Sequence, residues 1–121
     1  MIYNVTDLEV YGLSIELLKE LYTFLTKVPN SEFDSVKNCK RAGKSIPTNL
    51  AEGFGKRNSE ATFKNHILIC IGSSDEVMAH IQTIYTVVPK LEKEGLVLSE
   101  KYKILSRKLN SLHKNWKSYK Y

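Results

Sequence analysis

The residues best suited to chemistry lie between positions 40 and 55, where the chain contains the triplet Gly43-Lys44-Ser45. In a P-loop such a triplet follows an opening glycine, and the backbone N–H groups of the loop surround a phosphate. That glycine would fall at position 38, which is Asn in this chain. The triplet therefore does not predict a nucleotide-binding loop.

The other candidates for catalysis are isolated. His66 and His80 lie far apart in the sequence, and no glutamate accompanies them at the spacing of a helical metal site. Glu52 and Glu76 could pair as acid and base, but no nucleophile or positioned histidine accompanies them. The chain also lacks the Glu-x-x-His pairs of a di-iron bundle. We therefore expect no enzyme, no metal site and no cofactor.

The whole chain, 1–121, is predicted to form one domain around a single core. Apolar residues make up 42% of it and charged residues 26%, as in ordinary soluble proteins. No window is apolar enough to span a membrane, and the N-terminus lacks a secretory signal. We expect Cys39 and Cys70 to be reduced thiols, which favours a cytoplasmic location.

The net charge of +5 is unevenly placed along the chain. Residues 36–57 and 98–121 are basic, whereas residues 1–35 and 58–97 are acidic. Basic segments of this kind can attract nucleic acid. Alternatively, basic and acidic helices lie side by side and keep the surface soluble.

Four segments carry apolar residues at alternating spacings of three and four, which is typical of bundle helices. The expected segments are Thr6 or Asp7 to Val28, Ser31 to Gly53 or Gly55, Asn58 or Ser59 to Val88, and Ser99 to Tyr119. Residues 90–95 would add a final turn to the third helix, with Gly95 as its stop. No segment alternates with the period of a strand. We predict an all-α, antiparallel up-down-up-down four-helix bundle.

Pro47 lies inside the second segment. The apolar spacing continues in phase through it, so we predict a kinked helix. The alternative is that one helix stops near Lys44 and another starts at Pro47.

The first segment carries two apolar stripes. One contains Leu8, Tyr11, Ile15, Leu18, Tyr22 and Leu25, and the other contains Val10, Leu13, Leu17, Leu21, Phe24 and Val28. A small bundle has little room to bury a helix all round, so one stripe is expected to face a second copy of the chain. We assign that interface to Val10, Leu13, Leu17, Leu21 and Phe24. The alternative is that this helix is buried among its own neighbours.

The second segment also carries a basic face. A phosphate-binding strip is predicted at Lys37, Lys40, Arg41 and Lys44, extended by Lys56 and Arg57. The strip has no interleaved aromatic residues in the sequence, so base stacking is not expected. The alternative is a face that is only solvated.

A second polar stripe follows the helical period at Arg41, Ser45, Asn49 and Glu52. We predict that it forms a hydrogen-bonded network between helices or subunits that reaches Ser73 and Glu76, because each charge then has a partner. The alternative is exposed polar surface.

Several blocks of the chain resemble one family. They are Asp-Leu-Glu-Val-Tyr at 7–11, Lys-Arg-Ala-Gly-Lys-Ser-Ile-Pro-Thr-Asn-Leu-Ala-Glu-Gly at 40–53, and Phe63, Gly72-Ser73 and Glu76. These blocks resemble the four-helix bundle proteins encoded in 23S ribosomal RNA intervening sequences, whose central block reads Arg-Arg-Ala-Ala-x-Ser-Ile-Pro-Ser-Asn-Ile-Ala-Glu-Gly. The chain departs from the family pattern at Asn38, Lys40, Gly43 and Lys44.

The resemblance implies a left-handed bundle that assembles as a ring-shaped homopentamer without catalytic activity. The family is similar to accessory proteins of diversity-generating retroelements, which bind nucleic acid and a reverse transcriptase through a basic surface. Two functions follow as hypotheses: a homo-oligomer that binds RNA or DNA, or a scaffold that holds a protein partner. Neither involves a membrane.

Overall fold

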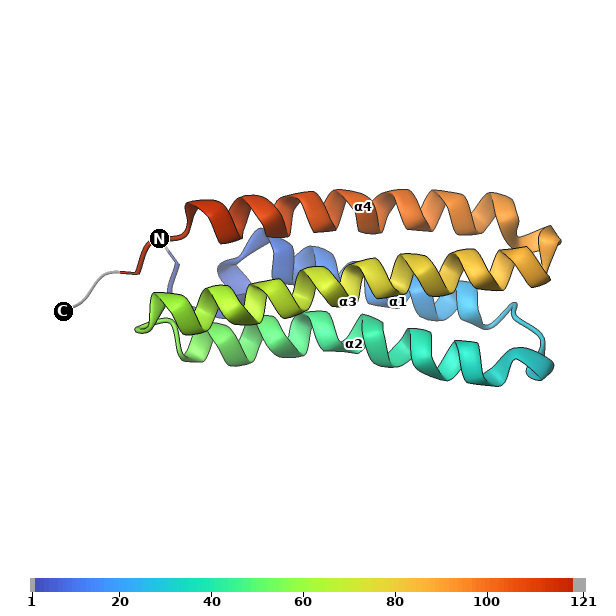
Figure 1. Cartoon of the computed structure of the whole chain (residues 1–121), viewed down its shortest axis with the longest axis horizontal. Helices are drawn as coiled ribbons and strands as arrows, with labels where there is room; N and C mark the ends of the chain where they lie inside the picture. Colours follow the sequence, from blue (N-terminus) through green and yellow to red (C-terminus); the bar gives the residue numbers. More distant parts are fainter. Residues whose placement is uncertain (1, 119–121) are drawn as a thin grey trace.

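The computed structural model describes residues 2–118, and four long helices dominate it. They are α1 (Glu9–Leu25), α2 (Phe33–Gly55), α3 (Glu60–Val87) and α4 (Glu92–Asn115), with 3-10 turns η1 (Val5–Asp7), η2 (Asn30–Glu32) and η3 (Pro89–Leu91). No strand occurs within residues 2–118. Successive long helices run in opposite directions along one common axis (Figure 1). The predicted all-α four-helix bundle is confirmed.

The helix starts follow local hydrogen bonding. Ser59 caps α3 as predicted, because its Oγ accepts a hydrogen bond from the Thr62 backbone N–H at 3.2 Å. Asp7 does not start α1: its carboxylate accepts the N–H groups of Tyr3 and Asn4 and closes η1 instead. These two hydrogen bonds also lower the pKa of Asp7. The first helix therefore begins at Glu9, later than predicted.

α2 runs without interruption through Pro47, whose side chain is buried. The alternative of two helices meeting at Pro47 is therefore wrong. The kink at this proline stays a prediction. Ser31 lies in η2 and not at the cap of α2.

The predicted start of the fourth helix at Ser99 is wrong. α4 begins at Glu92, and Gly95 lies inside it and not at a stop. A Cβ at Gly95 would lie 2.8 Å from the ring of Tyr85 on α3, so the glycine allows the two helices to approach closely. Gly95 is therefore explained by the close packing of α4 against α3, and it does not mark the end of a helix. Tyr119, the predicted end of this helix, lies outside the described residues.

The predicted interface on the first helix is also wrong. Val10, Leu17, Leu21 and Phe24 are at most 5% exposed and belong to the chain's own core, with Leu13 partly buried against it. The opposite stripe is the outer one, and its exposed or partly exposed members are Tyr11, Ile15, Leu18 and Tyr22. The aliphatic centre of the buried stripe, Leu13, Leu17 and Leu21, has no polar group to desolvate, whereas burying Tyr11 or Tyr22 of the other stripe would cost free energy unless its hydroxyl found a partner.

Both cysteines are buried thiols, Cys39 on α2 and Cys70 on α3. Burial raises the pKa of each thiol to about 12, so neither is ionised at neutral pH. They serve as small apolar residues of the core.

Candidate functional site

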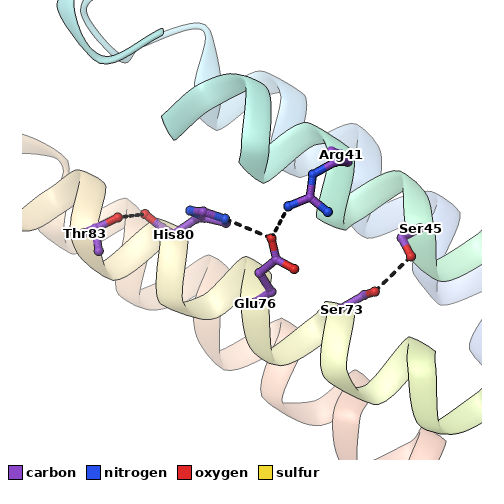
Figure 2. Close-up of polar contacts among 6 residues, drawn as sticks. All are labelled: Arg41, Ser45, Ser73, Glu76, His80 and Thr83. Carbon is purple, nitrogen blue, oxygen red and sulfur yellow. Dashed lines mark hydrogen bonds and ion pairs between the residues drawn. The ribbon is translucent and has the colours of Figure 1, made fainter. Parts of the chain in front are cut away.

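The flank of α2 that faces α3 carries a charged cluster. Arg41 donates from Nη2 to the Glu76 carboxylate, and His80 lies 3.1 Å from the same Glu76 oxygen (Figure 2). Partial burial alone would raise the pKa of Glu76, but the hydrogen bonds from His80 and Arg41 outweigh it and leave that pKa lowered. The carboxylate therefore stays ionised and holds both partners.

Further along the same two helices lies a group of neutral polar residues. Ser73 Oγ donates to Ser45 Oγ at 2.9 Å (Figure 2). Asn49 Nδ2 donates to the Ser45 backbone oxygen at 2.9 Å, and its Oδ1 lies 3.2 Å from His66 Nδ1. Hydrogen bonds thus cross from α2 to α3 at several levels of the bundle.

We call these residues the α2–α3 polar network: Arg41, Ser45, Asn49, His66, Ser73, Glu76 and His80. The structure places five of the six residues predicted for a network in two hydrogen-bonded groups, Arg41 with Glu76 and Ser45 with Asn49 and Ser73, and leaves out Glu52. Glu52 pairs with Lys56, four residues later on the same helix. Sequence reasoning missed both histidines. His80 follows Glu76 at helical spacing and was readable from the sequence, whereas the contact between His66 and Asn49 depends on how the helices pack.

The six basic residues predicted to bind nucleic acid do not form one surface. Arg41 is held by Glu76, and Lys56 by Glu52. Arg57 stacks over the Phe54 ring, with its guanidinium carbon 4.1 Å from the ring centroid. These three cations already have a role within the fold.

Arg57 lies at an aromatic cluster that closes one end of the bundle. Phe63 packs edge-on against Phe54 and Trp116, with ring centroids 5.9 Å and 4.9 Å away. Ser118 then donates to the backbone oxygen of Arg57 at 2.6 Å. This cluster makes Arg57 part of the bundle end, away from the predicted lysine strip.

The other three basic residues have a different environment. Within residues 2–118, no carboxylate lies at ion-pair distance from Lys37, Lys40 or Lys44. Lys40 Nζ lies 4.8 Å from the ring centroid of Tyr22 on α1, and Lys44 Nζ lies 5.8 Å from it. The tertiary structure therefore supplies an aromatic ring beside the lysine strip, contrary to the sequence expectation.

Phe33 extends this surface. It lies four residues before Lys37 on α2, and its side chain is 63% exposed. The spacing of Phe33, Lys37, Lys40 and Lys44 places them on one side of the helix. We call these four residues together with Tyr22 the α1–α2 basic face.

Basic residues on α4 are partly neutralised by α1. Lys101 donates to Glu20 of α1 at 2.6 Å and Lys108 pairs with Glu9 of α1, while Lys27, just beyond the end of α1, pairs with Glu94 of α4. Acidic and basic helices therefore lie side by side here, as one of the two readings of the charge pattern expected. α4 also carries Lys103, Arg107 and Lys114 without ion pairs, but no aromatic ring within residues 2–118 lies over them.

Two classes of site have no counterpart in the described part of the chain. Residues 2–118 contain no group of three or more His, Cys, Asp or Glu side chains that could hold a metal ion. None of the helices described is long and apolar enough to cross a membrane.

The fold and these surfaces define a four-helix bundle with a polar network on one flank of α2 and a basic face on the other. The family model for the 23S rRNA-intervening sequence protein matches residues 6–111, which is most of the chain. The chain belongs to this family. No protein with a curated description matches it.

Proposed function

We propose that this protein is a homo-oligomer that binds RNA or DNA through the α1–α2 basic face, without catalysis or cofactor. The observation that carries the proposal is that Lys37, Lys40 and Lys44 lie on one side of α2 without a carboxylate partner within residues 2–118, and that Lys40 and Lys44 lie over the Tyr22 ring. Neighbouring cations that the fold does not neutralise create a field that attracts phosphates.

A single face of three lysines binds weakly, and repetition makes up for this. Copies of the face in one assembly engage the same nucleic acid together, so the overall affinity far exceeds that of one copy. Exposed apolar side chains outside the α1–α2 basic face could form the contacts between copies, and among them are Leu68 and Ile69 on α3 and Leu96, Val97 and Ile104 on α4. We propose five copies, the number that the family resemblance implies.

The binding test compares two variants that lose the same charge. In the first, Lys37, Lys40 and Lys44 are replaced by Gln. In the control, the paired residues Lys27, Lys101 and Lys108 are replaced by Gln. Fluorescence anisotropy with labelled RNA and DNA oligonucleotides, titrated over a range of salt concentrations, measures the affinity of each variant.

We expect the first variant to lose most of its affinity and to show a shallower salt dependence, by about 0.7 to 0.9 in the log–log slope for each phosphate contact removed. The control should retain most of the wild-type affinity. Equal losses in the two variants, or no affinity of the wild type at low salt, would contradict the proposal. Circular dichroism of each variant verifies that it is folded.

Assembly has its own test. Light scattering should give a mass several times the 13.9 kDa of one chain. A monomer mass at all concentrations would contradict the oligomer while leaving the binding face standing.

A protein-interaction scaffold is the second candidate. The exposed apolar side chains on α3 and α4 favour it, because they could contact another protein as readily as another copy. It predicts a partner protein that co-purifies and remains bound after nuclease treatment. Loss of the partner on nuclease treatment would favour the nucleic-acid proposal.

A further inference from the structure

The α1–α2 basic face offers more than charge. A groove of about 530 Å³ lies along α1, with Lys40 of α2 at its edge. Its lining includes Ile15, Leu18 and Tyr22 from α1 and Lys40 from α2, so an apolar floor meets a cationic edge. Phosphates would contact only the cationic edge, which leaves the apolar floor available to a different part of the ligand.

The aromatic rings lie at two points along the lysine strip. Tyr22 lies beside Lys40 and Lys44, and Phe33 precedes Lys37 by one helical turn. At 1.5 Å per residue, the strip from Phe33 to Lys44 is roughly 16 Å long. A chain that alternates flat rings and negative charges at short intervals fits this arrangement.

A single-stranded nucleic acid has that pattern, and a duplex does not. In a duplex the bases are stacked and paired, so only its phosphates would reach the lysines, and the rings and groove would stay uncovered. In a single strand the unstacked bases can lie against aromatic side chains while the backbone follows the positive charges. Such stacking is tolerant of sequence because every base has a flat face.

We propose that the α1–α2 basic face binds single-stranded nucleic acid, with bases against Tyr22 and Phe33 and phosphates at Lys37, Lys40 and Lys44. This inference rests on the proposed function and narrows it to one class of ligand. A second copy of the chain is the competing occupant, since it too could cover the groove. The lysines without carboxylate partners argue against that occupant, because a copy that covered the groove without bringing carboxylates to them would bury unpaired positive charges.

The experiment measures the affinity for a single strand and for a hairpin duplex of equal length at one salt concentration, each as RNA and as DNA. The variants are Tyr22→Ala and Phe33→Ala, with Tyr22→Phe as the conservative version. Tyr3→Ala is the matched control, since Tyr3 is an exposed aromatic residue outside this face.

We expect the wild-type protein to prefer the single strand. Each of Tyr22→Ala and Phe33→Ala should weaken single-strand binding about tenfold and leave duplex binding unchanged. Tyr22→Phe and Tyr3→Ala should both behave as wild type. The comparison of RNA with DNA identifies which strand is preferred, and either preference supports the inference.

Three results would overturn it, and they differ in what they leave standing. Equal affinity for strand and duplex that depends on the lysines would overturn the single-strand inference and keep the proposed function. No binding to either would overturn both. A smaller mass for Tyr22→Ala in light scattering, with the strand preference intact, would assign the groove to a second copy. Circular dichroism excludes unfolding in each case.

Discussion

The two flanks of α2 differ in how their polar residues are satisfied. On the flank facing α3, Arg41 meets Glu76 and Ser45 meets Ser73, so charges and hydroxyls have partners within the chain. On the flank facing α1, Lys40 and Lys44 lie over the Tyr22 ring, and no carboxylate within residues 2–118 pairs with them. The first flank is built to hold two helices together, whereas the second leaves positive charge available.

This difference shows why a count of charges does not locate a binding surface. Residues 36–57 carry six basic residues, and in the sequence all six are equivalent candidates. The structure engages Arg41, Lys56 and Arg57 and leaves the other three without a carboxylate within residues 2–118. The two flanks therefore differ in whether their basic side chains already have partners, and the number of basic residues does not show this.

The largest expected change in the free energy of unfolding comes from adding a methyl group where α2 packs closely against α3. In Gly53→Ala, the new Cβ would lie 2.5 Å from His66 Cβ, an atom fixed to the backbone of α3. We expect a loss of about 1–3 kcal/mol in the free energy of unfolding, because α2 and α3 must separate. Urea denaturation measures it.

Gly43→Ala tests the same change on the α1 flank. Its Cβ would meet Leu21 Cδ2 at 2.8 Å and Leu18 Cδ1 at 3.1 Å, which are the ends of side chains that can rotate away. The loss in the free energy of unfolding should therefore be smaller than for Gly53→Ala. A larger loss for Gly43→Ala would show that α2 packs more tightly against α1 than against α3. Gly12→Ala is the control for helix propensity, since no described residue beyond its own helical turn lies within 4 Å of its Cβ position, and it should stabilise the protein by up to about 1 kcal/mol.

The next effect concerns a buried hydroxyl on the α1 side. Tyr102 Oη is buried without a hydrogen-bond partner among the described residues and lies 3.8 Å from the Cβ position of Gly43. Burial also raises the pKa of Tyr102. Tyr102→Phe removes the unsatisfied group and should raise the free energy of unfolding by about 1 kcal/mol, as measured by urea denaturation. A loss of stability would show that the hydroxyl has a partner.

The ion pair of the polar network should give a smaller effect. A double-mutant cycle with Arg41→Gln and Glu76→Gln should show a coupling of about 0.2–1 kcal/mol, because both side chains are partly exposed. A cycle pairing Lys40→Gln with Glu76→Gln should show none. Similar coupling in the two cycles would remove the distinction between the flanks.

The same carboxylate predicts a pH dependence. The folded-state pKa of Glu76 is lowered from its ordinary value of 4.5, so its contribution is present above that pH and is lost as the pH falls through the folded-state pKa. Stability measured against pH should therefore fall less steeply below pH 4.5 in Glu76→Gln than in the wild type. If the two proteins lost stability equally as the pH fell below 4.5, the ionised Glu76 carboxylate would not contribute to the stability of the fold.

The smallest effect is expected on the basic face. Lys37→Gln should change the free energy of unfolding by less than about 0.5 kcal/mol, because no carboxylate in the described chain depends on it. Its effect should appear in nucleic-acid affinity instead. A clear loss of stability on thermal denaturation would mean that Lys37 has a structural partner.

Much of the fold was predictable from local patterns. Apolar spacing predicts four helices, and Ser59 is a cap that the sequence reveals. The predictions were wrong where a residue type that suggests one local structure is present for a different reason, which is a contact with another helix. Gly95 reads as a stop in the sequence but permits contact with Tyr85, and either stripe of the first helix could face the core.

The candidate site was predictable only in part. Six residues of the polar network, all except His66, lie at spacings of three or four within α2 or α3, so their shared faces could be read directly. The contact of Tyr22 with Lys40 joins two helices, and no spacing within either helix predicts it. Phe33 was readable, since it lies one turn before Lys37 on the same face.

The sequence by itself determined the four helices, the polar and basic stripes of α2 and the membership of a family, because each depends only on the order of residues along the chain. Only the tertiary structure decided which cations are already paired, which stripe of α1 is buried and which ring lies beside the lysines. These depend on the rotation of each helix about its axis, which is set by the packing of all four helices together.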